Sequence, residues 1–322
     1  MIHYCRALIF VLTAAAILMV EQQCHGVSSV TPGNDEPWFT GPLLTPSARA
    51  IPPGHVNLEP YLFYNVITGR YGENWHATTL PTFNQITVQM QVKIGIIDRL
   101  DFSIAPQSSI AFSQGKTASS FGDLPIGFGY LLYRGEPDDW VDYLKLMVFE
   151  IIPIGKYHQL DPDLLGTDAF GQGSYITNIG LTVSKLFKVG CNHFLGCRCN
   201  ITTSIAAPAK LRGFNIFGGN ENTRGKIYPG TSWFFVAGAE FSVTQKFSLA
   251  CDFLAQFSPK KHFKGFTEIP ISPGETIQYS FAPAIEYNWN SSMGVIVGAW
   301  ITVAGKNSSR FINGVAAFNY YF

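Results

Sequence analysis

Apolar and polar residues alternate with a period of two along most of the chain after residue 54. Residues 84–97 show the alternation most clearly. One face of this segment carries Ile86, Val88, Met90, Val92, Ile94 and Ile96. A helix repeats every 3.6 residues and cannot present this pattern, whereas successive side chains of a strand point to opposite faces. The pattern therefore predicts an all-β chain.

Twelve segments of this kind follow one another, each about 11–15 residues long, whereas strands of ordinary globular proteins most often have about five or six residues. A tilted strand needs about 9–11 residues to cross a bilayer. The predicted connections alternate between long and short, which is typical of an antiparallel membrane barrel with its longer loops at one end. The sequence thus predicts a transmembrane antiparallel β-barrel of twelve strands. These are residues 55–66, 84–97, 100–112, 122–134, 142–154, 173–187, 197–211, 231–243, 247–257, 277–289, 293–303 and 310–322.

The last predicted strand runs from Arg310 to Phe322 and gathers aromatic residues at its end. Phe318, Tyr320 and Phe322 fall on one face, which suits the aromatic girdle of a lipid-facing strand. This ending resembles the C-terminal strand of bacterial outer-membrane barrels. The resemblance implies that the barrel-assembly machinery recognises it. We expect the strand to pair with residues 55–66 and close the barrel, with Asn313 and Asn319 turned inward.

The first 26 residues have the features of a cleaved signal peptide. Arg6 precedes an apolar run over residues 7–20, which is too short for a spanning helix, and we place the cleavage after Gly26. Cys24 raises the alternative of a lipoprotein, but the residues before it lack the small side chains of a lipobox. Residues 27–54 are rich in Pro and Gly, so regular strand pairing is not expected there. We predict a periplasmic segment or a plug of the lumen, followed by the barrel over residues 55–322.

Composition agrees with a surface that faces lipid. Charged residues make up 14% of the chain, compared with about 25% in typical soluble domains. Lys and Arg together number 22, as do Asp and Glu. This balance offers no net charge to attract nucleic acid, so no nucleic-acid partner is expected. The expected surroundings are a lipid bilayer in the outer membrane and, in the lumen, a small-molecule solute.

Polar residues on the face opposite the apolar one are the candidates for the lumen. Two interpretations remain open: the group selects a solute, or its charges only pair across a polar interior that any barrel of this size requires. For each single residue the second interpretation is favoured. The candidates are Glu59, Gln91, Lys93, Asp101, Lys145, Arg198, Glu240, Asp252 and Glu286.

Cysteine and enzyme motifs add little chemistry. After cleavage four cysteines remain, and Cys191 with Cys197 is the best disulfide candidate because the two flank a predicted turn. A zinc site built from Cys191, Cys197, Cys199 and His193 would be a weak match to known ligand spacings. The sequence carries no nucleophile elbow, metalloprotease, phosphate-loop or dinucleotide motif. We therefore expect no catalytic residues, no metal and no cofactor.

Three stretches resemble the outer-membrane transporter family named after the meta-pathway of phenol degradation. They are residues 41–54 (GPLLTPSARAIPPG), residues 122–130 (GDLPIGFGY), and residues 152–156 (IPIGK) followed by 165–171 (LGTDAFG), where Asp168 replaces the usual Gly. The resemblance covers residues 41–322 and implies an outer-membrane channel for small hydrophobic or aromatic compounds. The alternative is a surface protein that does not transport, such as an adhesin, receptor or structural protein that acts through its long loops.

Overall fold

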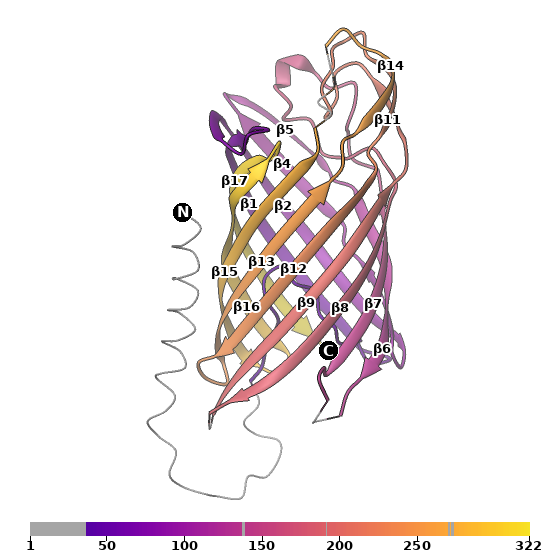
Figure 1. Ribbon diagram of the computed structural model, residues 1–322. Coiled ribbons are helices and arrows are strands. Elements are labelled where there is room, and N and C mark those ends of the chain that lie inside the picture. Colours follow the sequence, from indigo (N-terminus) through magenta and orange to yellow (C-terminus); the bar gives the residue numbers. More distant parts are fainter. Residues whose placement is uncertain (1–36, 137–138, 191, 270, 272–273) are drawn as a thin grey trace, which may run out of the picture.

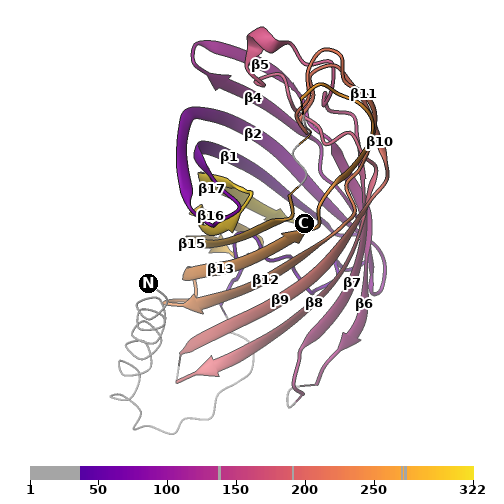
Figure 2. The same cartoon turned by 45° about the horizontal axis from the view of Figure 1, so that its top comes forward.

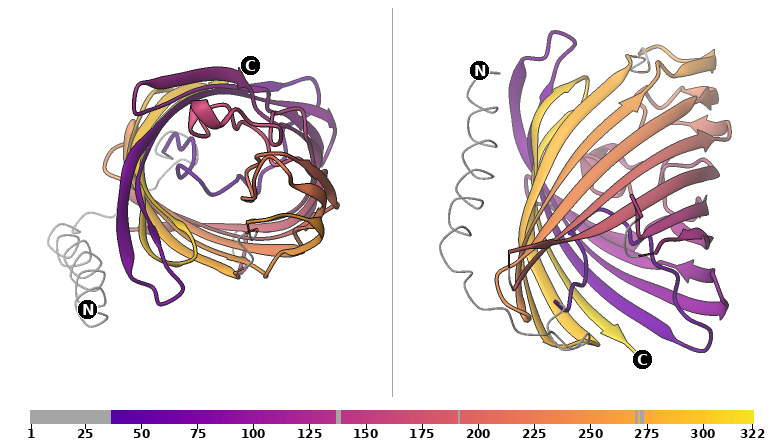
Figure 3. Two further views of the ribbon diagram at one scale, coloured as in Figure 1. Left: turned by 90° about the horizontal axis from the view of Figure 1, so that it is seen from above. Right: turned by 60° about the horizontal axis from the view of Figure 1, so that its bottom comes forward.

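The computed structural model describes residues 37–322, except 137–138, 191, 270 and 272–273. In this part of the chain the strands wind into a closed, tilted antiparallel barrel around a central lumen (Figures 1, 2 and 3). The described chain also holds one short 3-10 helix, η1 (Pro162–Leu164). No helix in the described residues is long and apolar enough to cross a membrane.

The barrel wall is a single sheet of 14 strand segments. The segments are β1 (Val56–Tyr71), β2 (Ala77–Ile97), β3 (Leu100–Ile104), β4 (Gln107–Ser113), β5 (Lys116–Phe121), β6 (Leu124–Arg134), β7 (Tyr143–Ile152), β8 (Ile176–Val189), β9 (His193–Ala206), β12 (Thr231–Ser242), β13 (Phe247–Ser258), β15 (Thr276–Asn290), β16 (Met293–Lys306) and β17 (Ser309–Tyr321). A second sheet contains β10 (Ala209–Arg212), β11 (Arg224–Tyr228) and β14 (His262–Phe266).

Two of the wall strands are interrupted, which reduces 14 segments to twelve wall strands. Both β3 and β4 pair with β2, and they are separated at Ala105 and Pro106. Likewise β5 pairs with β4 and β6 pairs with β3, with Gly122 and Asp123 between them. Proline has no backbone donor, so the ladder breaks at Pro106. The predicted twelve-stranded barrel is therefore confirmed.

The first and last strands close the barrel. Leu58 pairs with Tyr320 and Val66 with Ile312, and β1 pairs on its other side with β2. Val56 and Phe322 exchange two backbone hydrogen bonds of 2.8 and 3.0 Å at one end of this seam. Closure leaves no free strand edge there, as hydrocarbon surroundings require.

The two faces of the wall differ as the alternation predicts. Apolar side chains such as Val88, Trp233 and Ile285 are exposed on the outer surface. Inward-facing side chains are mostly polar and buried, among them Asn313 in the last strand, while Asn319 lines the central cavity. Tyr320 and Phe322 are exposed on the outside. An apolar outer belt around a polar lumen is typical of barrels that stand in a membrane.

Half of the predicted long connections are in fact strands. β1 continues to Tyr71, and β2 already begins at Ala77. The predicted connection over residues 113–121 is a tight turn at Gln114 and Gly115 followed by β5. The connection over residues 304–309 is equally short. These hairpin ends show no regular apolar alternation, and the one between β1 and β2 carries the strand-forming residues Thr78, Thr79 and Thr82. Of the predicted long connections, the other three keep a long part outside the strands of the described chain, between β7 and β8, β10 and β11, and β14 and β15.

The second sheet extends the wall beyond β9, β12 and β13 without changing their register. Ile205 of β9 pairs with Thr231 of β12. Four residues further along one strand and four back along the other, Ala209 pairs with Ile227, which is the same antiparallel register. Pro208, Pro229 and Pro259 lie in the three gaps between β9 and β10, β11 and β12, and β13 and β14. Because each lacks a backbone donor, the ladder breaks across all three strands and the small sheet forms separately.

Candidate functional site

The site of interest is the lumen, which residues 37–54 enter from the end where the chain terminates (Figure 3). This plug segment, defined here as residues 37–54, has no strand structure, in agreement with its Pro and Gly content. Together with the wall it lines a cavity of about 900 Å³. The cavity and the plug segment share the same space, so a solute in the lumen would contact both.

Two wall carboxylates hold the middle of the plug segment through its backbone amides. Asp252, on β13, accepts hydrogen bonds from the amides of Leu44 (3.1 Å) and Thr45 (3.0 Å), and from Thr45 Oγ1 (2.5 Å). Glu286, on β15, accepts one from the amide of Thr40 (2.5 Å) and one from Asn288 (2.7 Å). These are bonds to buried carboxylates, which are stronger than bonds between neutral groups.

An ion pair between β9 and β12 supports the same region. Arg198 Nη2 lies 3.2 Å from Glu240 Oε1, and the Glu240 side chain is 1% exposed. The guanidinium also lies against Gly41, where an added Cβ would be 2.4 Å from Arg198 Nη1. Gly41 has a φ of +125°, a backbone conformation that favours glycine.

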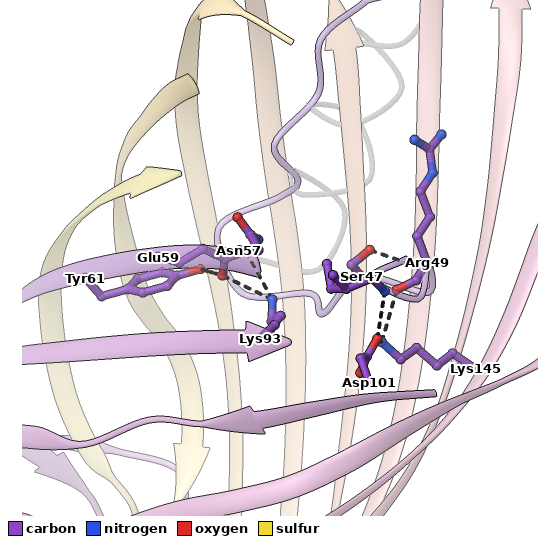
Figure 4. A network of polar contacts seen from close by, with 9 residues as sticks. Ser47, Arg49, Asn57, Glu59, Tyr61, Lys93, Asp101 and Lys145 are labelled. Atoms are coloured by element: carbon purple, nitrogen blue, oxygen red, sulfur yellow. Dashed lines mark hydrogen bonds and ion pairs between the residues drawn. The ribbon is translucent and has the colours of Figure 1, made fainter. Parts of the chain in front are cut away.

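A second clamp holds the other end of the plug segment (Figure 4). Asp101, on β3, accepts hydrogen bonds from the amide of Ile51 (3.0 Å) and from Lys145 Nζ (2.6 Å). Lys145, on β7, also donates to the carbonyl of Arg49 (3.0 Å). Both side chains of this ion pair are almost fully buried. The pair therefore satisfies its own charges and holds the plug segment in place.

A third polar group lies on β1 and β2 beside the plug segment (Figure 4). Lys93 Nζ is 3.1 Å from Glu59 Oε1. Glu59 also accepts hydrogen bonds from Asn57 (2.6 Å) and from the Tyr61 hydroxyl (3.4 Å). Each charge in this group has an opposite partner, which lowers the cost of placing it inside the barrel.

One side of the lumen is apolar. Leu43 of the plug segment packs with inward-facing Ala282, Ile296 and Val315, and Tyr61, Phe63 and Trp300 pack around them. These wall residues come from β1 and from β15 to β17. The lumen is thus amphipathic, with an apolar strip among the charged groups that hold the plug segment.

The structure brings the nine predicted lumen residues into one region. Glu59, Gln91, Lys93, Asp101, Lys145 and Arg198 line the cavity, and Glu240, Asp252 and Glu286 are buried beside the plug segment. Sequence reasoning did not find that Asp101, Asp252 and Glu286 accept hydrogen bonds from the backbone amides of residues 40, 44, 45 and 51. Only the Pro and Gly content of residues 27–54 indicated a free backbone. The predicted disulfide remains untested because Cys191 lies outside the described residues.

Asp123 lies at a gap in the barrel wall, where β5 and β7 do not pair with each other. β5 ends the sheet on one side, while β7 stops at Ile152 opposite Leu124. The carboxylate of Asp123 accepts hydrogen bonds from the amides of Gly155 (2.9 Å) and Gln172 (2.7 Å). Asp123 thus ties both ends of the connection between β7 and β8 to the wall at this separation.

The described residues contain no group of three or more His, Cys, Asp or Glu side chains placed to hold a metal ion. The chemistry that this lumen offers is hydrogen bonding, ion pairing and apolar contact.

No protein-family model matches the sequence, and no curated protein matches it either. Solved structures do match the fold. An outer-membrane channel from Pseudomonas putida F1 superposes with a TM-score of 0.64 at 13% identity, over 91% of this chain and 100% of that chain. The transport unit of the autotransporter AIDA-I from Escherichia coli gives 0.46 at 12% identity, over 84% and 91%. The first match shows that the chain has the fold of an outer-membrane β-barrel.

Proposed function

We propose that this chain is an outer-membrane channel for small solutes with an apolar or aromatic body, and that the plug segment is its gate. The observation that carries the proposal is the closed barrel with an apolar outer belt and a cavity of about 900 Å³ inside. A protein with this outer surface is stable in lipid, and the lumen then offers a path between the two sides.

The lining of the lumen supports the solute class. The apolar strip around Tyr61, Phe63 and Trp300 suits an apolar or aromatic body. The ion pairs beside this strip and elsewhere in the lumen supply charges and hydrogen-bonding groups for a polar end. Ligand sites commonly combine an apolar lining with a few placed polar groups.

The resemblance of residues 41–54, 122–130, 152–156 and 165–171 to the meta-pathway transporter family points in the same direction. The fold match to an outer-membrane channel of Pseudomonas putida F1 agrees with it. We assign the chain to that transporter family as part of the proposal. On this assignment the long connections lie outside the cell and both chain ends lie in the periplasm.

Liposome swelling tests the proposal. Proteoliposomes with the full mature chain are compared with proteoliposomes that hold a chain lacking residues 37–54, for an uncharged aromatic solute and for a sugar of similar size. We expect the deletion to raise the flux of both solutes and the full chain to prefer the aromatic one. No flux of either solute through either protein, with both proteins folded, would contradict a transport function.

A further inference from the structure

The small sheet outside the barrel wall collects basic side chains on one of its faces. In its three strands, Lys210 pairs with Lys226 and Lys226 with Lys264, which places three lysines in one row. In the next row Arg212 pairs with Arg224. All five side chains are exposed.

The other face of the sheet is apolar and fixes its orientation. Ala209, Leu211 and Ile227 are at most 3% exposed, and Tyr157 and Phe217 pack on them. Phe217 also lines a second cavity with residues from the tops of β1, β15 and β17. The apolar face is therefore turned toward the mouth of the barrel, and the basic face is turned away from it.

Holding these five cations together is unfavourable in the free protein. Like charges directly opposite each other on neighbouring strands are destabilising. Among the described residues none of the five side chains forms an ion pair, and Lys264 Nζ lies 5.3 Å from the centre of the Tyr228 ring. In the lumen, by contrast, Lys93 and Lys145 each have a carboxylate partner. An external anion would remove the repulsion.

The height of the sheet indicates where that anion comes from. Ile205, Trp233 and Phe257 are 48%, 49% and 40% exposed and form the end of the apolar belt on β9, β12 and β13. Lys210 follows Ile205 by five positions. At about 3.3 Å per residue and a tilt of about 45°, this is roughly 12 Å above the belt. The polar headgroup layer extends about 5–8 Å beyond the hydrocarbon, and the long side chains of Lys and Arg can reach back to it from this height.

We propose that the face formed by Lys210, Arg212, Arg224, Lys226 and Lys264 binds the phosphate groups of glycolipids in the outer leaflet around the barrel. The row of lysines and the row of arginines would contact phosphates on neighbouring sugars, because Arg and Lys are the side chains that bind phosphate. This site is separate from the solute path. It requires that the barrel stands in an outer membrane, but not that a solute crosses it.

The test measures binding of the folded barrel, in neutral detergent, to a diphosphorylated glycolipid and to the same glycolipid after removal of its phosphates. The variant carries Lys210→Gln, Lys226→Gln and Lys264→Gln. A control variant carries Arg70→Gln, Lys116→Gln and Arg310→Gln, which removes the same charge from other exposed strand ends. Heat-modifiable gel migration shows that each protein is folded.

We expect the lysine variant to bind the phosphorylated glycolipid about a hundredfold more weakly, since each basic residue near an anionic surface contributes appreciably. The control should bind like the wild type, and added salt should weaken wild-type binding. Equal binding by the lysine variant, or equal binding of the dephosphorylated glycolipid, would overturn the proposal. Binding of soluble polyphosphate without binding of the glycolipid would also overturn it. Solute flux through the lysine variant, measured in parallel, separates this outcome from a failure of the channel function.

Discussion

Replacing Asp252 by Asn should free the middle of the plug segment. The carboxylate is fully buried and accepts three hydrogen bonds, two from the amides of Leu44 and Thr45 and one from Thr45 Oγ1. Bonds to a charged acceptor contribute about 1.5–3 kcal/mol each. The amide of Asn keeps one acceptor oxygen but turns a donor toward the remaining amide, so roughly half of the interaction is lost.

The loss is therefore about 3 kcal/mol of the free energy that holds the plug segment in the lumen. Each 1.4 kcal/mol corresponds to a tenfold change in an equilibrium, so the ratio of open to closed lumen should rise about a hundredfold. Single-channel recording in planar bilayers measures this ratio as the time spent open relative to the time spent closed. Labelling of a cysteine placed at Leu43 by a water-soluble maleimide should rise in parallel.

The matched control is Asp142→Asn. Asp142 also accepts an amide hydrogen bond, from Leu186 at 2.7 Å, and pairs with Lys185, but it has no contact with the plug segment. This variant should open as rarely as the wild type. If folded Asp252→Asn protein opened no more often than the control, the clamp would not hold the gate and the reasoning would be refuted.

Three further predictions concern the wall and the seam. Lys145→Met leaves Asp101 buried without its partner and should cost about 3–5 kcal/mol of stability, measured as a lower denaturant midpoint in detergent. Adding Asp101→Asn should restore most of this stability. An unchanged midpoint in the single variant would contradict the paired-charge account. Gly95→Ala should open the channel, because the added Cβ would lie 1.9 Å from the carbonyl oxygen of Pro52 in the plug segment. Gly314→Ala, which has open space around it, should not open the channel. Equal conductance in the two variants would disprove the contact. Deletion of Phe322 removes two backbone bonds of the seam, so the fraction of heat-modifiable protein should fall, and an unchanged fraction would argue against its role in closure and assembly.

Much of the barrel was predictable because the period of two is a local property of the chain. Residues 84–97 alternate strictly, and the structure shows them as part of β2. The seam between the first and last strands was predictable too, since a barrel in lipid leaves no strand edge unpaired. The extended hairpin after Ile67 was missed because Thr78, Thr79 and Thr82 carry strand propensity without an apolar face.

The lumen was predictable in composition but not in its contacts. The alternation of apolar and polar positions placed Asp101, Asp252 and Glu286 inside the barrel. Nothing in the neighbouring sequence indicates that they accept hydrogen bonds from amides about 50 to 250 positions away. The break between the wall and the small sheet at Pro208, Pro229 and Pro259 could not be predicted either. These three residues are distant in sequence and come near one another only when the strands pair.

The most direct test of the central claim uses a reversible link between the plug segment and the wall. An added Cβ at Gly238 would lie 2.6 Å from Thr45 Oγ1, so Thr45→Cys with Gly238→Cys places two sulfur atoms within bonding reach. Solute flux is measured in proteoliposomes, in a background whose native cysteines are replaced by alanine. We predict that the oxidised protein passes no aromatic solute and that dithiothreitol restores the flux in the same preparation. Equal flux before and after reduction would contradict the claim that the plug segment gates the lumen.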